Sequence, residues 1–163
     1  MNSATGASSG PAITADELLK QWQGHRRLTR RVIEAFPDDE ALFHYSIGGM
    51  RPFGGLVVEF LSMAVPIVRG VATGKWTSAE AVTPATRADL LQLWDEDTAE
   101  IDRLWPSIPP HRFQEVDTAF GQWKMPGYEM ILYGIDNEIH HRGQGYVYLR
   151  ALGVEPPAFY DRS

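Results

Sequence analysis

The sequence predicts an all-α protein folded as a four-helix bundle. Four long segments carry apolar side chains at the spacing of one helix face, the primary sign of an amphipathic helix. No regular alternation of strands with helices accompanies them, so a parallel sheet is not expected. The chain has 163 residues and a 44% hydrophobic content, enough for one domain with a buried core. We predict a disordered tail at residues 1–12, rich in Ser, Gly and Ala, and a single domain at residues 13–163.

The first helix is predicted to begin at Thr14. Its hydroxyl suits the N-cap position, and Glu17 lies three residues further on, which is the spacing of a capping box. The apolar stripe that follows consists of Leu18, Trp22, His25, Val32 and Phe36. Pro37 should end this helix, because proline lacks the amide hydrogen and its ring clashes with the preceding turn. Residues 38–50 are predicted to form a short extra helical turn and a loop.

The second helix is predicted from Phe53 to Arg69. Pro52 suits the start, where a missing amide hydrogen costs nothing. Apolar residues then recur at steps of three and four. Pro66 is expected to kink the far end of the helix. Residues 70–83 are rich in Gly, Thr and Ser and are predicted to be a linker.

The remaining elements are a third helix, a hairpin and a fourth helix. The third helix is predicted to start at Thr83-Pro84, and the proline at position 106 should end it. Residues 113–124 alternate loosely between apolar and polar side chains, which predicts a small hairpin. The fourth helix is predicted at residues 128–152, because Gly153 and two prolines follow it as a usual stop pattern.

Composition excludes several classes of function. The formal net charge is −6, whereas a nucleic-acid binder needs a basic surface to displace counterions from phosphates. The chain has no cysteine, which excludes disulfides, thiolate zinc sites and cysteine nucleophiles. The longest apolar stretch, from Phe53 to Val68, is interrupted by Glu59 and Pro66 and is too short for a membrane span. No signal peptide is apparent, so a cytoplasmic location without membrane or nucleic-acid partners is expected.

The centre of the fourth helix departs from an apolar seam. The seam runs through Met130, Gly134, Asn137, His141, Gln144, Tyr148 and Leu152. Its middle positions are polar, and buried polar groups are costly unless they are hydrogen-bonded or coordinated. Asn137 and His141 are four residues apart, so their side chains lie on one face of the helix. This is the spacing with which a helix offers two ligands to one metal ion.

The second helix carries a matching exception. Glu59 is the only ionisable residue between Phe53 and Val68, and it lies next to the seam position Phe60. If the two helices are neighbours, Glu59, Asn137 and His141 converge on one cation. The alternative interpretation is a histidine satisfied by hydrogen bonds within the core and a glutamate that faces water.

Two stretches of the sequence resemble the DinB/YfiT-like family. The first is the run Ile135-Asp136-Asn137-Glu138-Ile139-His140-His141-Arg142-Gly143-Gln144, followed by residues 148–157. The second is Met50-Arg51-Pro52-Phe53-Gly54, at the start of the second helix. Helix order and length also fit, so the resemblance covers nearly the whole chain.

The resemblance implies an up-down-down-up bundle and, commonly, a homodimer. Members often carry zinc or nickel, held by one histidine on the second helix and two on the fourth in the order His-x-x-x-His. Some are transferases or isomerases that use bacillithiol or mycothiol, and others are linked to DNA damage by expression alone. The resemblance therefore also suggests a stress-response role.

This chain differs from the family pattern at two of the three ligand positions. Glu59 and Asn137 stand where histidines are usual, and His141 is retained. Such a set favours nickel, manganese or magnesium over tightly bound zinc. Arg142 and Gln144 are expected to orient the ligands as hydrogen-bond donors.

Three hypotheses about function follow. In the first, a divalent metal (Ni, Mn or Zn) at Glu59, Asn137 and His141 activates water or a thiol cosubstrate, as in a hydrolase or a thiol-dependent transferase. In the second, the same three residues form a polar network in a metal-free, non-catalytic bundle, whose cavity is vestigial or binds a small ligand. In the third, the chain is a dimeric scaffold that pairs through aromatic residues near Trp123 and Tyr160.

Overall fold

The computed structural model describes residues 11–163. Most of the predicted tail, residues 1–10, lies outside the described residues. The helices are α1 (Ala15–Ala35), α2 (Asp39–Phe43), α3 (Phe53–Thr73), α4 (Arg87–Leu104) and α5 (Gly127–Ala151), with 3₁₀ turns η1 (Trp105–Ser107) and η2 (Pro110–Phe113). Two short strands, β1 (Val116–Ala119) and β2 (Trp123–Pro126), form the remaining regular structure. The predicted all-α class is confirmed.

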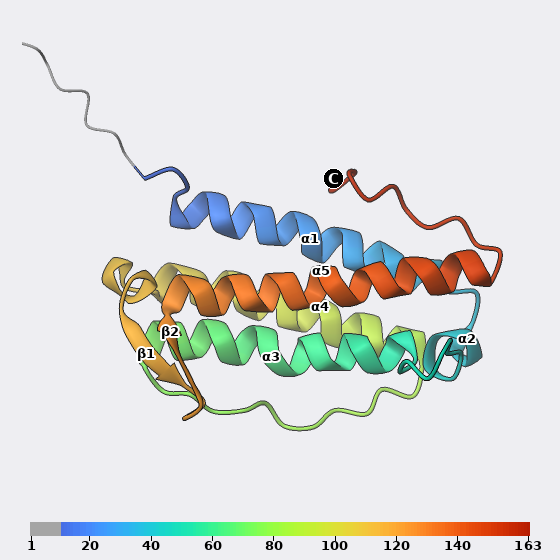
Figure 1. Cartoon of the computed structure of the whole chain (residues 1–163), viewed down its shortest axis with the longest axis horizontal. Coiled ribbons are helices and arrows are strands. Elements are labelled where there is room, and N and C mark those ends of the chain that lie inside the picture. Colours follow the sequence, from blue (N-terminus) through green and yellow to red (C-terminus); the bar gives the residue numbers. More distant parts are fainter. Residues whose placement is uncertain (1–10) are drawn as a thin grey trace, which may run out of the picture.

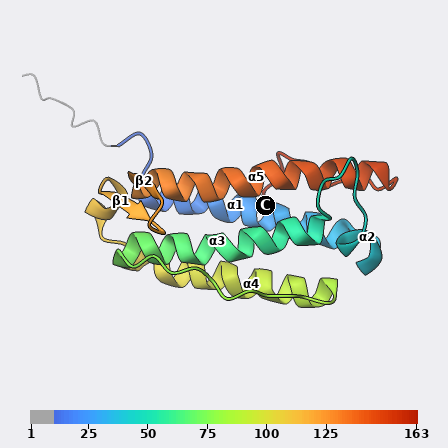
Figure 2. The same cartoon turned by 60° about the horizontal axis from the view of Figure 1, so that its bottom comes forward.

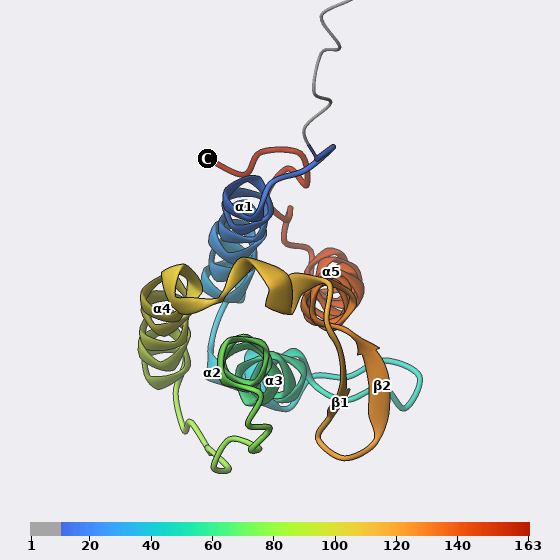
Figure 3. The same cartoon turned by 90° about the vertical axis from the view of Figure 1, so that its left-hand side faces the viewer.

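Four long helices form the bundle, with α1 and α5 running in one direction and α3 and α4 in the other (Figure 1). Seen along the bundle, the helices lie in the order α1, α4, α3, α5 around a ring (Figure 3). The principal neighbours of α5 are therefore α1 and α3. The direction of each helix matches the predicted up-down-down-up arrangement.

A long connection allows α3 and α4 to be parallel. Residues 74–86 carry no helix or strand and run back along the length of the bundle beside α3 (Figure 1). Figure 2 shows α3 and α4 side by side, with α2 at one end of the pair. The amide of Arg87 donates to Asp39 Oδ1 at 2.7 Å, so the start of α4 is fastened beside α2.

Local signals set several boundaries correctly. Thr14 caps α1 and forms the predicted capping box with Glu17. The predicted extra helical turn is α2. The hairpin predicted at residues 113–124 is the antiparallel pair β1–β2, which begins three residues later and ends two residues later than predicted, with Val116 opposite Pro126. Helix α5 begins at Gly127 and ends at Ala151, within one residue of the prediction at each end.

Two boundaries were predicted wrongly. Helix α3 runs on through Pro66 and Gly70 to Thr73, so the expected linker begins only at Gly74. Gly70 lies inside the helix and makes room for the side chain of Trp76, because a Cβ at position 70 would lie 2.1 Å from the Trp76 ring. Helix α4 begins after Thr86, not at Thr83-Pro84, because Thr86 and Asp89 form a capping box.

Helix α3 is the most buried of the long helices. It meets the length and hydropathy criteria for a membrane span over Phe53–Thr73, yet 61% of that window is buried inside the protein. The core helix of a soluble protein meets the same criteria. Glu59, with a side chain 28% exposed, lies at the border of this apolar surface, where α3 meets α5.

Candidate functional site

The structure brings the three predicted site residues together between α3 and α5. Glu59 Oε1 lies 3.3 Å from His141 Nε2. Asn137 donates to the same oxygen from its Nδ2 at 3.2 Å. The expected neighbour relation between the second and fourth long helices is therefore present, and it positions one carboxylate oxygen against both side chains.

The orientation of His141 is fixed by Gln144. His141 Nδ1 lies 2.5 Å from Gln144 Oε1, and Gln144 Nε2 donates to the sulfur of Met50 at 3.4 Å. An amide oxygen can only accept, so Nδ1 of the imidazole carries the hydrogen. Nε2, which faces Glu59, is consequently the atom left for a second proton or for a metal ion.

The site is largely enclosed. The His141 side chain is 12% exposed, and its ring stacks on Phe60 with centroids 5.7 Å apart. Asn137 Oδ1 is buried and has no hydrogen-bond partner among the described residues. A buried acceptor without a partner is uncommon in folded proteins and marks a place where a water molecule, ion or ligand is expected.

The donor atoms are compatible with a divalent cation. Two ligand atoms that each lie about 2.1 Å from a metal at tetrahedral or octahedral angles are about 3.0–3.4 Å apart. The 3.3 Å between Glu59 Oε1 and His141 Nε2 falls within that range. However, no group of three or more histidine, aspartate or glutamate side chains suited to a metal occurs within residues 11–163. The site has two such side chains and one amide.

Arg51 closes the outer side of the site. Its guanidinium forms an ion pair with Glu59 Oε2, the oxygen that does not face His141. Partial burial raises the pKa of the Glu59 carboxyl, but the hydrogen bonds from Arg51 and Asn137 outweigh that effect, so the pKa is lowered overall. The carboxylate therefore stays ionised and able to bind a cation at neutral pH.

A small pocket opens beside the carboxylate. It has a volume of about 400 Å³ and lies between α3 and the long connection. Its polar lining consists of Arg51, Glu59, Ser62 and Glu80, and its apolar lining comes mainly from Val58 and the segment 79–82. A small molecule in this pocket would contact Glu59 from the side opposite the bundle core.

A second polar cluster, which the sequence analysis did not predict, lies on the adjacent face of α5. It includes Glu138 and Arg142, which directly follow Asn137 and His141 in the sequence. Glu138 is only 1% exposed and accepts from Trp22 Nε1 at 3.2 Å and from Thr29 Oγ1 at 2.6 Å. Arg142 was expected to support the metal ligands. Its NH1 instead donates to the carbonyl oxygen of His25, and its NH2 lies 3.0 Å from His25 Nδ1.

This cluster faces α1, whereas the site faces α3. Helix α5 has two buried faces because it lies between those two helices. The spacing of four between Glu138 and Arg142 was the available signal, since such pairs form on one side of a helix. Their NH1-to-Oε1 distance is 3.7 Å.

Comparisons with known proteins agree with the fold. The model of the DinB family matches residues 72–163, more than half of the chain. A DinB-like protein from Bacillus cereus ATCC 10987 is similar in structure, with a TM-score of 0.72, 19% identity, and coverage of 89% of this chain and 97% of the other. A DinB-like protein from Bacillus subtilis has a TM-score of 0.73, 18% identity, and coverage of 90% and 99%. No curated protein matches the sequence.

Proposed function

The chain belongs to the DinB family, and from this premise we propose that it is a divalent-metal-dependent enzyme. Its class would be a hydrolase or a transferase that uses a low-molecular-weight thiol. The cation, nickel, manganese or zinc, would be held between α3 and α5 by Glu59 and His141, with Asn137 as the third group.

One observation carries the proposal. A tautomer with its hydrogen on Nδ1 directs the lone pair of His141 Nε2 toward a carboxylate oxygen 3.3 Å away. Two acceptors at that distance repel each other unless a proton or a cation lies between them. The buried, unpartnered Oδ1 of Asn137 is a further oxygen close to the same place.

The chain's own residues have separable roles in this proposal. Gln144 holds the imidazole in the orientation that a metal ligand needs. Phe60 covers one face of the ring and limits access of water. Arg51 keeps the Glu59 carboxyl ionised and positions it. The pocket bounded by Ser62 and Glu80 would take the substrate.

A divalent cation bound there would supply Lewis acidity, lowering the pKa of a water molecule or thiol toward neutrality. The chain has no cysteine, so the nucleophilic sulfur of a thiol transfer has to come from a cosubstrate. The pocket of about 400 Å³ is within the usual range for small-molecule sites.

Elemental analysis tests the proposal directly. The wild type, His141→Ala and His140→Ala are purified without a tag and incubated with nickel, manganese or zinc. We expect about one equivalent of metal in the wild type and in His140→Ala, whose histidine is exposed, and none in His141→Ala. Absence of metal from all three proteins, or its retention in His141→Ala, would contradict the proposal.

The alternative function is a metal-free bundle that binds a ligand. One observation favours it: Glu59 already accepts from Arg51 on one oxygen and from Asn137 on the other, and a His141 ring that carries a hydrogen on both nitrogens would also donate to that second oxygen. A carboxylate with these donors needs no cation. In that case Glu59→Gln and His141→Gln would change stability little, and added metal would leave the wild-type melting temperature unchanged.

We also propose that the protein is a cytoplasmic homodimer with a role in the stress response. Exposed apolar side chains on α5 support the dimer, since Ile139 and Val147 are 37% and 52% exposed and lie on the same side of the helix. The molar mass in solution, measured by light scattering, tests it. A monomer at all concentrations would count against this part of the proposal.

A further inference from the structure

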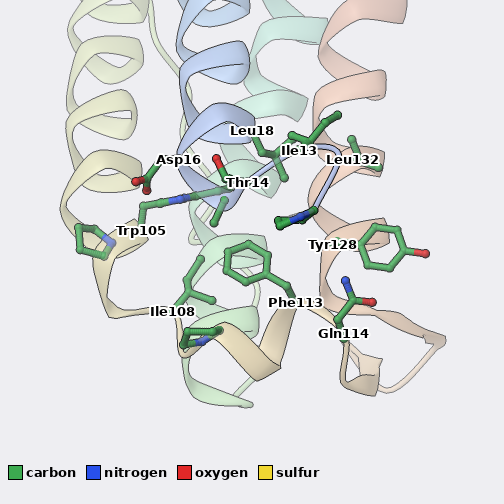
Figure 4. Close-up of a pocket in the computed structure, with 14 residues that line it drawn as sticks. Ile13, Thr14, Asp16, Leu18, Trp105, Ile108, Phe113, Gln114, Tyr128 and Leu132 are labelled. Carbon is green, nitrogen blue, oxygen red and sulfur yellow. The ribbon is translucent and has the colours of Figure 1, made fainter. Parts of the chain in front are cut away.

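A second and larger pocket lies where α1 and α5 begin (Figure 4). Its volume is about 610 Å³, within the range of pockets that bind small ligands. Its lining includes Leu18, Trp105, Ile108, Phe113, Tyr128 and Leu132. None of its lining residues belongs to the site around Glu59 and His141 or to the pocket beside it.

Trp105 carries a buried hydrogen-bond donor at the wall of this pocket. The residue is 4% exposed and packs against Trp22 and Phe113, with ring centroids 6.2 Å and 5.7 Å apart. Its indole Nε1 is buried and has no hydrogen-bond partner among the described residues. Buried tryptophan N–H groups usually have an acceptor, and this one belongs to a residue that lines an open pocket.

The charges around the pocket indicate what kind of acceptor fits. No lysine, arginine or histidine lines it among residues 11–163, and Asp16 contributes a carboxylate. The N-termini of α1 and α5 supply only partial positive charge, so an anionic ligand would meet the Asp16 carboxylate with no side-chain cation to offset the repulsion. The Thr14 hydroxyl is already used in the capping box, and Tyr128 donates to Glu129. Gln114 also lines the pocket, but it is exposed and water can satisfy its amide. Among the described lining residues, the buried donor without a partner is therefore the Trp105 N–H, and it favours a neutral acceptor.

We propose that this pocket binds an uncharged, mainly apolar small molecule whose carbonyl oxygen accepts a hydrogen bond from Trp105 Nε1. The apolar body of the ligand packs against Leu18, Ile108 and Phe113. Leu132, on α5, borders the entrance at 38% exposure. This site is independent of the proposed metal centre and needs no metal.

Two neutral fluorescent naphthalenes test the proposal with the full chain. The first is 6-propionyl-2-dimethylaminonaphthalene, which carries a ketone, and the second is N-phenyl-1-naphthylamine, which does not. We expect one equivalent of each to bind with a blue-shifted emission. Trp105→Phe should weaken the ketone probe about 5–10-fold, the value of one neutral hydrogen bond, and leave the other probe unchanged.

Further variants separate the outcomes. Leu132→Trp should fill the entrance and abolish binding of both probes, whereas Tyr133→Trp, on the adjacent exposed position, should not. His141→Ala should bind both probes normally, which distinguishes this site from the metal centre. Failure of either probe to bind the wild type would overturn the proposal, as would full binding to Leu132→Trp. An equal loss of both probes in Trp105→Phe would overturn the carbonyl assignment.

Discussion

Removal of the Glu138 carboxylate probes the buried cluster between α1 and α5. Glu138→Ala leaves the Trp22 indole N–H without its acceptor and Arg142 without its counter-charge. Trp22 is 1% exposed and Arg142 6% exposed, so water cannot easily replace the lost groups. Arg142 retains its bonds to His25 and Thr29, but these neutral partners do not compensate its charge.

The expected loss of unfolding free energy is large. Breaking a buried ion pair by removing one partner costs about 3–5 kcal/mol. An unsatisfied buried donor alone costs about 1–3 kcal/mol, and this loss is contained in the larger figure. For a chain of this length, about 1 kcal/mol corresponds to about 2–4 °C in Tm. Glu138→Ala should therefore lower Tm by roughly 6–20 °C.

Thermal and urea unfolding followed by circular dichroism measure the change, with Asp136→Ala as the matched control. Asp136 is on the same helix but exposed, and its loss should cost within about 0.5 kcal/mol. Adding Arg142→Met to Glu138→Ala should recover part of the loss, because the uncompensated charge is removed. A Tm for Glu138→Ala equal to that of Asp136→Ala would refute the reasoning.

Two further predictions concern His25 and Gly145. Burial, together with the neighbouring cations Arg142 and Arg162, lowers the pKa of His25 to about 4. Between pH about 6.5 and 4, the unfolded chain then binds more protons at this histidine than the folded chain does. Acidification through this range should therefore lower the unfolding free energy of the wild type, relative to that of His25→Gln, by about 3 kcal/mol. Urea unfolding at pH 7, 5.5 and 4 measures this difference, and a constant difference would contradict it. Gly145→Ala places a Cβ 2.6 Å from the buried ring of Phe53 and should cost about 1–3 kcal/mol. Gly143→Ala, on the same helix with no atom within 4 Å, should instead stabilise by about 0.5–1 kcal/mol, and similar Tm values for the two variants would be inconsistent with the packing described.

Local chemistry explains which helix ends could be predicted. The capping box of Thr14 and Glu17 involves residues three apart, so the sequence contains the whole interaction. Gly70 was mistaken for part of a linker because its role depends on Trp76, which folds back against it. Thr83-Pro84 offered a plausible start for α4, but Thr86 and Asp89 offered a better one.

The polar interior was only half visible in the sequence. The polar seam positions Asn137 and His141, together with the lone carboxylate Glu59 of the second helix, predicted one site. These three side chains are in contact in the structure. The seam did not include Glu138 and Arg142. Each follows a seam residue by one position and therefore lies on the adjacent face of α5, toward α1. Recognising them requires knowing that α5 lies between two helices, and this follows from packing around the ring rather than from the periodicity of one segment.

The ring order has a consequence for synthesis of the chain. The principal neighbours of α1 are α4 and α5, both of which follow α3 in the chain. Arg26 donates a hydrogen bond to the carbonyl oxygen of Trp94, which is made 68 residues later. The carbonyl oxygen of His25 accepts from Arg142, which is made 117 residues later. Helices α3 and α4 can pair first, because they are close in sequence. A nascent chain that ends before Gly127 therefore exposes the face of α1 that packs against α5, and chaperones can bind this face until α5 has been made.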